Sequence, residues 1–229
     1  MKLQKIFGKL TKFELALWLG SLTTVIACSI ISKSDWMNIT ASAIGVTALI
    51  FVAKGLPVGQ LLTVVFSLAY ALVSFRFRYW GEMITYLGMS MPMALFSFLS
   101  WLRHPFRKDA PEVKIESVTK KKWILLALST IAITVLFYFI LSALSTPNIV
   151  FSTLSVATSF LAASLLFFRS PFYAIAYAGN DLVLIVLWIL ASVSNPVFLP
   201  MIACFFAFFF NDMYGFFCWI KRQKAQISS

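Results

Sequence analysis

Long apolar stretches, each broken by a few polar or basic residues, recur along the whole chain. Each stretch has roughly 20 residues, the length that a helix needs to cross about 30 Å of hydrocarbon. A single span satisfies its backbone hydrogen bonds in lipid only as a helix, so we predict an all-α polytopic membrane protein. The eight predicted spans are residues 13–31, 36–53, 57–75, 83–102, 123–144, 148–168, 172–192 and 197–220.

Composition and charge agree with this pattern. Of the 229 residues, 61% are hydrophobic and 12% are charged, whereas about a quarter of the residues of a soluble globular protein are charged. Sixteen of the nineteen Lys and Arg residues fall on one side of the eight-span topology, which predicts a protein of the cell (inner) membrane with both termini cytoplasmic. The net charge of +11 is thereby explained by topology. We expect membrane lipids around the protein and no nucleic-acid partner.

Two pairs of landmarks indicate an internal repeat. Pro57 and Pro171 each open a span after a basic break, and Trp101 and Trp219 each close a span beside a basic residue. Their nearly equal offsets indicate two three-helix units pointing the same way, a parallel repeat as in SWEET proteins. For Trp219 we expect a place at the membrane interface. The predicted segments are 1–35 with an extra helix, 36–102 as first unit, 103–147 as cytoplasmic loop and linker helix, 148–222 as second unit, and 223–229 as tail.

The N-terminal span has an alternative interpretation. Residues 25–28 (VIAC) resemble a bacterial lipoprotein cleavage site, and cleavage before Cys28 would leave seven spans. The apolar run continues to Ile31, which favours an uncleaved anchor. The three cysteines fall inside spans without a paired or CxxC spacing, so no disulfide framework, metal site or cofactor is expected.

Two acidic residues lie inside predicted spans, where an ionisable group costs about 2.5–3.5 kcal/mol on insertion scales. Asp181 and Asp212 each follow an asparagine, Asn180 and Asn211, on the last two spans. Counted from the cytoplasmic side, both pairs fall about 12–13 Å into the membrane at 1.5 Å per residue. We predict that they line a polar cavity for a small hydroxylated molecule.

Further candidates share these faces or lie in the first unit. Tyr173, Tyr177 and Trp188 recur at helical spacing with the Asn180–Asp181 pair, and their rings could stack on a planar heterocycle. In the first unit, the candidates are Gln60, Thr63, Tyr70, Glu82 and Tyr86, and Pro92 invites a kink in its span. Gln60 lies near the start of its span and Glu82 lies at the outer edge, so solvation is an open alternative for both.

The polar residues inside the spans have two other possible roles. The side chains could bond to one another and join helices without binding a ligand. Asp181 and Asp212 could also form a protease dyad, but the flanking residues lack the GxGD pattern of intramembrane aspartyl proteases. The only histidine, His104, lies in the charged loop, and no GxxxxGK[ST] loop is present. An enzyme and an ATP-driven pump are therefore not expected.

Three parts of the chain resemble PnuC-type nicotinamide riboside transporters. The resemblance covers roughly residues 36–222, and the segments that carry it are 80–84 (WGEMI) through 101–102 (WL), 180–188 (NDLVLIVLW), and 199–201 (LPM) through 211–216 (NDMYGF). It implies facilitated diffusion of nicotinamide riboside, with the site between the two units, a cytosolic riboside kinase that traps the product, and a homotrimer.

One departure from the family leaves the substrate open. Some members carry a WxxW pair where this chain reads Tyr173-Ala174-Ile175-Ala176. Tyr173 and Tyr177 could take over the aromatic role, or the substrate could be thiamine or riboflavin, with which relatives are associated. By resemblance we expect the two units to rock about a central site and to expose it alternately to each side of the membrane.

Overall fold

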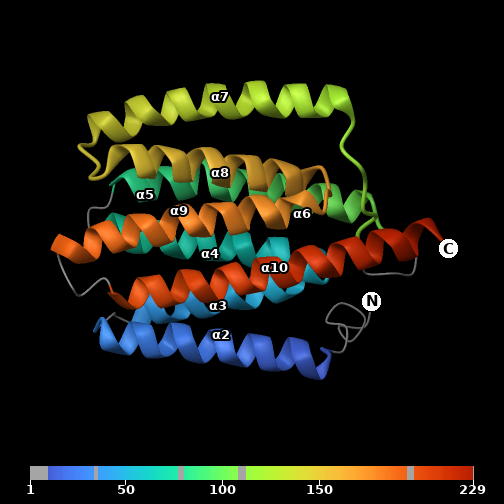
Figure 1. Ribbon diagram of the computed structural model, residues 1–229, viewed down its shortest axis with the longest axis horizontal. Helices are drawn as coiled ribbons and strands as arrows, with labels where there is room; N and C mark the ends of the chain where they lie inside the picture. The colour runs from blue at the N-terminus through green and yellow to red at the C-terminus, as the bar shows by residue number, and fades with distance from the viewer. Residues whose placement is uncertain (1–9, 34–35, 77–79, 108–111, 195–198, 229) are drawn as a thin grey trace.

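The computed structural model describes residues 10–33, 36–76, 80–107, 112–194 and 199–228, and these residues form a bundle of long helices (Figure 1). The elements are α2 (Lys12–Ile31), α3 (Trp36–Ala53), α4 (Pro57–Arg76), α5 (Trp80–Thr85), the π-helix η1 (Tyr86–Ser90), α6 (Met91–Arg103), α7 (Lys120–Ala143), α8 (Ile149–Phe167), α9 (Phe172–Ser194) and α10 (Leu199–Ile227). Each predicted span corresponds to one helix, except that the fourth is divided into α5, η1 and α6. The all-α membrane fold is thus confirmed, and α10 continues through most of the predicted tail.

Six membrane-length segments form a closed ring. Going round it, α3 packs on α4, α4 on α6, α6 on α8, α8 on α9, α9 on α10, and α10 returns to α3. The α6–α8 contact is the counterpart of the α10–α3 contact, as a parallel repeat requires. Outside the ring, α2 packs against α3 and α10, and α7 packs against α8, on opposite sides of the bundle (Figure 1).

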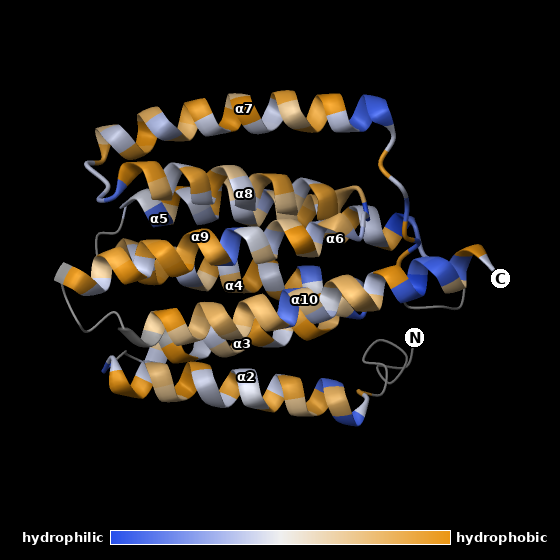
Figure 2. Cartoon of the chain, viewed as in Figure 1, coloured by the Kyte–Doolittle hydropathy of each residue, from blue (hydrophilic) through white to orange (hydrophobic). Residues whose placement is uncertain are grey.

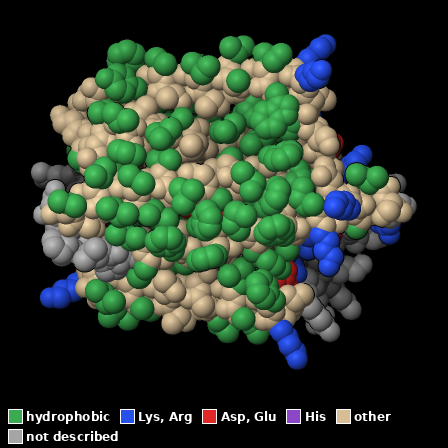
Figure 3. Space-filling view, viewed as in Figure 1, with side chains coloured by type: hydrophobic (Ala, Val, Ile, Leu, Met, Phe, Trp, Pro, Cys, Tyr) green, Lys and Arg blue, Asp and Glu red, His purple; other side chains and the backbone are tan. Residues whose placement is uncertain are grey.

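The outside of the bundle is apolar, as expected in lipid. Among the described residues, seven helices are long and apolar enough to cross a membrane, with Trp80–Arg103 counted as one, and the apolar part of α3 is shorter, Ile39–Ala53. Figure 2 shows hydrophobic residues along the helices, with hydrophilic bands halfway along α9 and α10. Most Lys and Arg side chains visible in Figure 3 lie at the end of the bundle where α10 finishes. We call this the basic end, and the opposite one the far end.

Corresponding turns follow α3 and α8 at the basic end. Gly55 and Arg169 both have left-handed backbone conformations, with φ of 67° and 58°. The Gly55 N–H donates to the Val52 carbonyl at 2.8 Å, and the Arg169 N–H donates to the Leu166 carbonyl at 2.9 Å. This conformation is costless for glycine but strained for arginine, whose side chain must therefore be held by other contacts.

Two tryptophans cross between the units at these turns. The Trp101 Nε1 of the first unit donates to the Leu166 carbonyl at 3.2 Å, and the Trp219 Nε1 of the second unit donates to the Val52 carbonyl at 3.0 Å. Both side chains are fully buried, and their ring centroids are 5.4 Å apart. The expected interfacial place of Trp219 is therefore wrong: its ring is inside the protein, where its N–H is a second donor to the Val52 carbonyl beside the Gly55 N–H.

The loop between α6 and α7 crosses both turns at the basic end. The Val113 N–H donates to the Gly55 carbonyl at 2.9 Å, and the Glu116 N–H donates to the Arg169 carbonyl at 3.0 Å. The Glu116 carboxylate also lies 2.7 Å from the Arg169 guanidinium, which donates in addition to Ser100 Oγ at 2.8 Å. These contacts hold the strained Arg169 in place and join the loop to both units.

The fourth span changes its helix type before Pro92. Proline has no N–H, so the regular bond to the carbonyl of Gly88, four residues earlier, cannot form. The Met91 N–H instead reaches back five residues to the Tyr86 carbonyl, which defines the π turn η1. The distortion predicted at Pro92 is thus present, as a π turn that reorients Tyr86 and its neighbours.

Candidate substrate site

The two predicted aspartates meet halfway along the bundle. Asp181 of α9 and Asp212 of α10 are 4% and 6% exposed, and their carboxyl groups lie within hydrogen-bonding reach of each other. Asp181 Oδ2 has no hydrogen-bond partner among the described residues. Two adjacent acids in the membrane with an unsatisfied oxygen form a strong acceptor site for a polar or cationic group.

The two predicted asparagines point away from this pair. Asn180 Oδ1 accepts hydrogen bonds from Ser155 Oγ at 3.1 Å and Thr158 Oγ1 at 2.8 Å, both on α8. Asn211 Nδ2 donates to Ser21 Oγ of α2 at 2.6 Å and to the carbonyl one turn earlier on α10. Asn211 Oδ1 is buried and has no partner in the described part of the chain.

The divergence follows from helix geometry. Neighbouring residues on a helix point about 100° apart, so an Asn–Asp pair cannot present both side chains in one direction. The sequence predicts each pair on a single face, whereas the structure brings the carboxyls together and turns the amides towards α8 and α2. Part of the predicted helix-to-helix bonding is therefore present, at the two asparagines.

Tyrosines surround the carboxyl pair. Tyr177 is close enough to Asp181, Asp212 and Tyr86 to interact with each of them electrostatically. Its ring lies edge-on to that of Tyr173, with centroids 6.2 Å apart. Tyr86 comes from η1 of the first unit, so the predicted residues of both units approach each other here. Phenol rings and hydroxyls beside two acids suit a planar, polar guest.

Tyr173 lies deeper, against the basic end. It is 2% exposed and packs on Trp219, with ring centroids 4.8 Å apart. A Cβ at Gly215 of α10 would come within 3.0 Å of the Tyr173 hydroxyl, so the glycine makes room for it. Tyr173 therefore connects the candidate site with the tryptophans that join the two units.

Two predicted residues lie elsewhere. Gln60 of α4 is 1% exposed, with its Nε2 unpartnered among the described residues, so the solvated alternative is wrong for it. Ser67, seven residues later on the same face, is also fully buried with an unpartnered hydroxyl. Trp188 stacks on Phe205 at 6.5 Å, about 10 Å along α9 from Asp181 towards the far end.

Glu82 was a candidate of the first unit for which a solvated place at the outer edge stayed open. In the structure it is half-buried and turned inward, and its carboxylate accepts a hydrogen bond from the Tyr70 hydroxyl. It also interacts with Tyr86, one turn further along the helix. A helical spacing of four from Glu82 to Tyr86 was the only sequence signal that could have connected it with the site.

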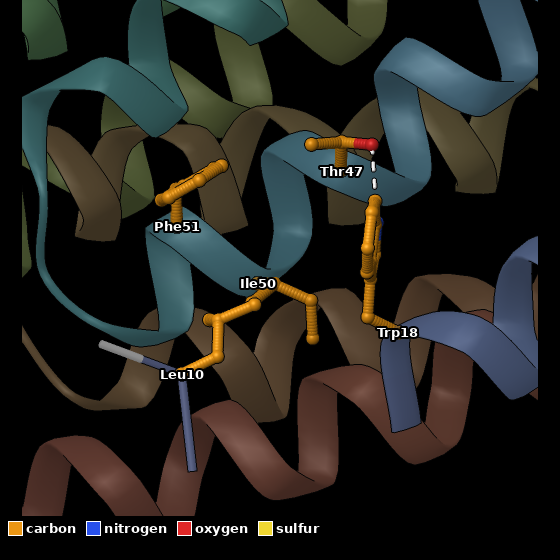
Figure 4. A pocket seen from close by; sticks show the side chains of 5 residues that line it. All are labelled: Leu10, Trp18, Thr47, Ile50 and Phe51. Atoms are coloured by element: carbon orange, nitrogen blue, oxygen red, sulfur yellow. Dashed lines mark hydrogen bonds between the residues drawn. The ribbon is translucent and has the colours of Figure 1, made fainter. Parts of the chain in front are cut away.

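Two pockets lie beside α2. The first, of about 250 Å³, is lined by Leu10, Trp18, Thr47, Ile50 and Phe51, and Trp18 Nε1 donates to Thr47 Oγ1 at 3.1 Å across it (Figure 4). The second, of about 260 Å³, lies between α2 and α10. Neither is lined by a predicted site residue. Their apolar walls fit lipid chains or packing defects better than a polar substrate.

Comparison with known proteins identifies the family. The sequence model of the nicotinamide mononucleotide transporters matches residues 35–221. The chain belongs to the nicotinamide mononucleotide transporter family. This family consists of membrane transporters and not enzymes, so the close Asp181–Asp212 pair is no catalytic dyad.

Relatives of this transporter chain extend over almost its whole length. The nicotinamide riboside transporter PnuC of Neisseria mucosa is 26% identical over 226 residues, which cover 96% of this chain and 86% of that protein. PnuC of Haemophilus influenzae is 23% identical over 194 residues, covering 84% and 83%. A crystal structure of the vitamin B3 transporter PnuC has the same fold, with a TM-score of 0.80, 24% identity and 97% of both chains covered.

Proposed function

We propose that this transporter carries nicotinamide riboside into the cell by facilitated diffusion, through a site between the two three-helix units. The names of its relatives in Neisseria mucosa and Haemophilus influenzae support the riboside as substrate. The observation that carries the proposal is the buried Asp181–Asp212 pair beside Tyr177. The pyridinium ring of the riboside is planar and cationic, and its ribose supplies hydroxyl donors for the carboxylates.

The charge of the site favours the riboside over its 5′-phosphate. Nicotinamide mononucleotide carries a phosphate group, which Arg or Lys normally recognises. In the described residues, the ion pairs of Lys and Arg lie at the basic end, and two acids occupy the middle of the membrane. A phosphate there would be repelled by the carboxylates and have no cation to pair with. The anionic nucleotide is therefore a poor substrate.

The charge of the site also ranks the two alternative vitamins as substrates. Thiamine carries a cationic thiazolium ring and is the second candidate, since it offers the same charge and a planar heterocycle. Riboflavin is uncharged and has a three-ring system, so it has less to gain from the acids. We place the protein in the cell membrane with the basic end cytoplasmic, on the positive-inside bias.

For the transport cycle we propose that the units rock about the site. The buried Trp101 and Trp219 and the loop over both turns support a conformation closed at the basic end. Entry would then come from the far end, and release would require these contacts to part. We also propose a homotrimer and trapping of the product by a cytosolic riboside kinase, both implied by the family resemblance.

The test is a ligand panel on the purified protein. Nicotinamide riboside, its mononucleotide, thiamine and riboflavin are added separately, and the unfolding temperature is measured in detergent. A ligand bound only to the native state stabilises it, by about 2.7 kcal/mol at one hundred times its Kd. We expect the largest stabilisation with the riboside and none with the mononucleotide. Stabilisation by the mononucleotide equal to that by the riboside would contradict the proposal.

Variants then test the site. Asp181→Asn and Asp212→Asn keep shape and remove charge, and each is expected to weaken riboside binding at least tenfold. Asn180→Ala is also expected to abolish binding without unfolding the protein, because loss of the acceptor for Ser155 and Thr158 would shift α9 against α8 and displace Asp181. Glu112→Gln is the matched control, because Glu112 pairs with Arg222 at the basic end. Uptake into proteoliposomes with and without a pH gradient tests facilitated diffusion, which a strict dependence on the gradient would rule out.

A further inference from the structure

Three aromatic rings lie close together near Glu82, two on α4 and one on η1. Tyr70 and Tyr86 have ring centroids 4.5 Å apart, and Phe66 lies 5.7 Å from Tyr70 and 5.8 Å from Tyr86. The Phe66 and Tyr86 planes are nearly perpendicular, at 85°, so the rings face different directions. We call Phe66, Tyr70 and Tyr86 the aromatic box.

Glu82 is the charged member of this region. The Tyr70 hydroxyl donates to its carboxylate, and Tyr86 lies one turn away on the same helix face. Within the described part of the chain, no Lys or Arg forms an ion pair with it. An acid inside a membrane bundle with a phenol as its described partner is costly as an anion, and a cation entering beside it would remove that cost.

The side chains of Glu82, Tyr86 and Tyr177 are alike in their exposure to solvent. Each keeps accessible surface and is only half-buried. Tyr173, by contrast, is packed to 2% exposure.

The π turn places Tyr86 in this group. In η1 the Met91 N–H bonds to the Tyr86 carbonyl, so the residues before Pro92 are rotated relative to a regular helix. Tyr86 thereby contacts Tyr70 and Phe66 on α4 and also approaches Tyr177 on α9. Tyr177 is also near Asp181 and Asp212, so it lies between the aromatic box and the acid pair.

We propose that Glu82 and the aromatic box form a subsite that binds the cationic ring of the substrate, so that the protein selects its substrate by charge as well as shape. Aromatic faces within about 6 Å attract a cation, and the carboxylate adds direct attraction. The subsite lies in the half of the bundle towards the far end. The ribose then points to Asp181 and Asp212. This inference rests on the proposed function and goes beyond it by assigning the charged ring to its own residues.

The decisive comparison uses two forms of one ligand. Nicotinamide riboside has a cationic pyridinium ring, and its reduced 1,4-dihydro form has nearly the same size and hydrogen-bonding groups but no charge. Binding of both forms is measured by calorimetry on the detergent-purified full chain, for the wild type and for Glu82→Gln. We expect the wild type to bind the cation at least tenfold more tightly than the neutral form. Glu82→Gln should lose at least tenfold in affinity for the cation and less than threefold for the neutral form.

Two further variants keep the test informative. Tyr70→Phe keeps the ring and removes the hydroxyl that holds the carboxylate, and it should weaken binding of the cation by two- to fivefold with no change for the neutral form. Glu112→Gln changes the same residue type at the basic end and should change neither. If Glu82→Gln fails to fold, the wild-type preference for the cation and the Tyr70→Phe result decide the question.

The outcomes separate this inference from the proposed function. Absence of riboside binding by the wild type would overturn both. Riboside binding that Glu82→Gln leaves unchanged would overturn the subsite alone. Equal losses for the charged and the neutral form would show that Glu82 supports the fold, and would also overturn the subsite. A loss confined to the cation supports it.

Discussion

The two three-helix units meet differently at the basic end and in the middle of the membrane. At the basic end, Trp101 and Trp219 each donate a hydrogen bond to a helix-end carbonyl of the other unit, and Arg169 adds a bond to Ser100. In the middle, the units approach through tyrosine rings, with Tyr86 of one near Tyr177 of the other. The first region is packed and its donors are satisfied, whereas the second contains acids with an unsatisfied oxygen.

This difference assigns two tasks to two regions: the basic end holds the two units together, and the middle binds the substrate. Hydrogen bonds to helix-end carbonyls can break without disturbing the helices, because those carbonyls have no partner within the helix. Buried acids without a partner in the middle of the membrane cost free energy, and a bound substrate that pairs with them removes this cost. Changes at the basic end should therefore alter stability and accessibility, and changes in the middle should alter affinity.

The largest effect should come from removing both indole donors. In the double variant Trp101→Phe with Trp219→Phe, each carbonyl keeps the N–H of its turn but loses the indole donor. Each lost hydrogen bond costs about 0.5–1.5 kcal/mol, and the smaller rings leave cavities that add to this cost. We expect a clearly lower unfolding temperature and faster thiol labelling of cysteines introduced at the basic end. Trp123→Phe is the control, because Trp123 is 41% exposed at the same end. Equal unfolding temperatures for the double variant and the control would contradict the closed arrangement.

A smaller loss is expected from a methyl group at a close helix contact. A Cβ on Gly59 would lie 2.6 Å from the Val52 backbone nitrogen, and backbone cannot move aside. Gly59→Ala should therefore destabilise the protein by about 1–3 kcal/mol and disturb the carbonyl that Trp219 binds. Gly88→Ala, in η1, is the matched variant, since nothing lies within 4 Å of its Cβ position. Chemical denaturation of both should separate them, and equal midpoints would contradict the prediction.

The smallest effect concerns the charge of Glu116 in the loop. Burial raises the pKa of this carboxyl, but the hydrogen bond from Arg169 and the nearby positive charges, Arg169 and Lys122 among them, together outweigh it, so that the pKa lies below its ordinary value of 4.5. The stabilisation is then present above about pH 4.5 and is lost as the pH falls through the lowered pKa. It should amount to less than about 1 kcal/mol, because the carboxylate is partly exposed. Unfolding temperatures between pH 7 and pH 4 should fall less steeply for Glu116→Gln than for the wild type. Parallel curves would refute the effect.

The fold could be predicted because its signals are local. Span length, the prolines at 57 and 171, and the tryptophans at 101 and 219 are visible in the sequence, and they locate the helices and the repeat. The contacts of those tryptophans could not be predicted, because an indole next to a basic residue is equally typical of a lipid interface. Only the packing of the two units shows that both indoles are inside.

The site was predictable in part, and its limits have a geometric cause. Depth alone brought Asp181 and Asp212 to the same level, and the structure places them together. Depth does not tell which way a side chain points, so the asparagines next to them were grouped with the acids. For Glu82 the sequence left a solvated place open, because its surroundings depend on Tyr70, twelve residues away, and on a π turn that hydrophobic periodicity does not reveal.

The loop over the basic end limits how far the units can separate. Val113 and Glu116 bind the turns of the first and the second unit, and only Lys114 and Ile115 lie between these two attachment points. Three residue steps span at most about 10 Å. The loop therefore acts as a fixed-length tether: in the proposed rocking motion, the basic end can widen beyond this reach only after one of the two backbone bonds has detached.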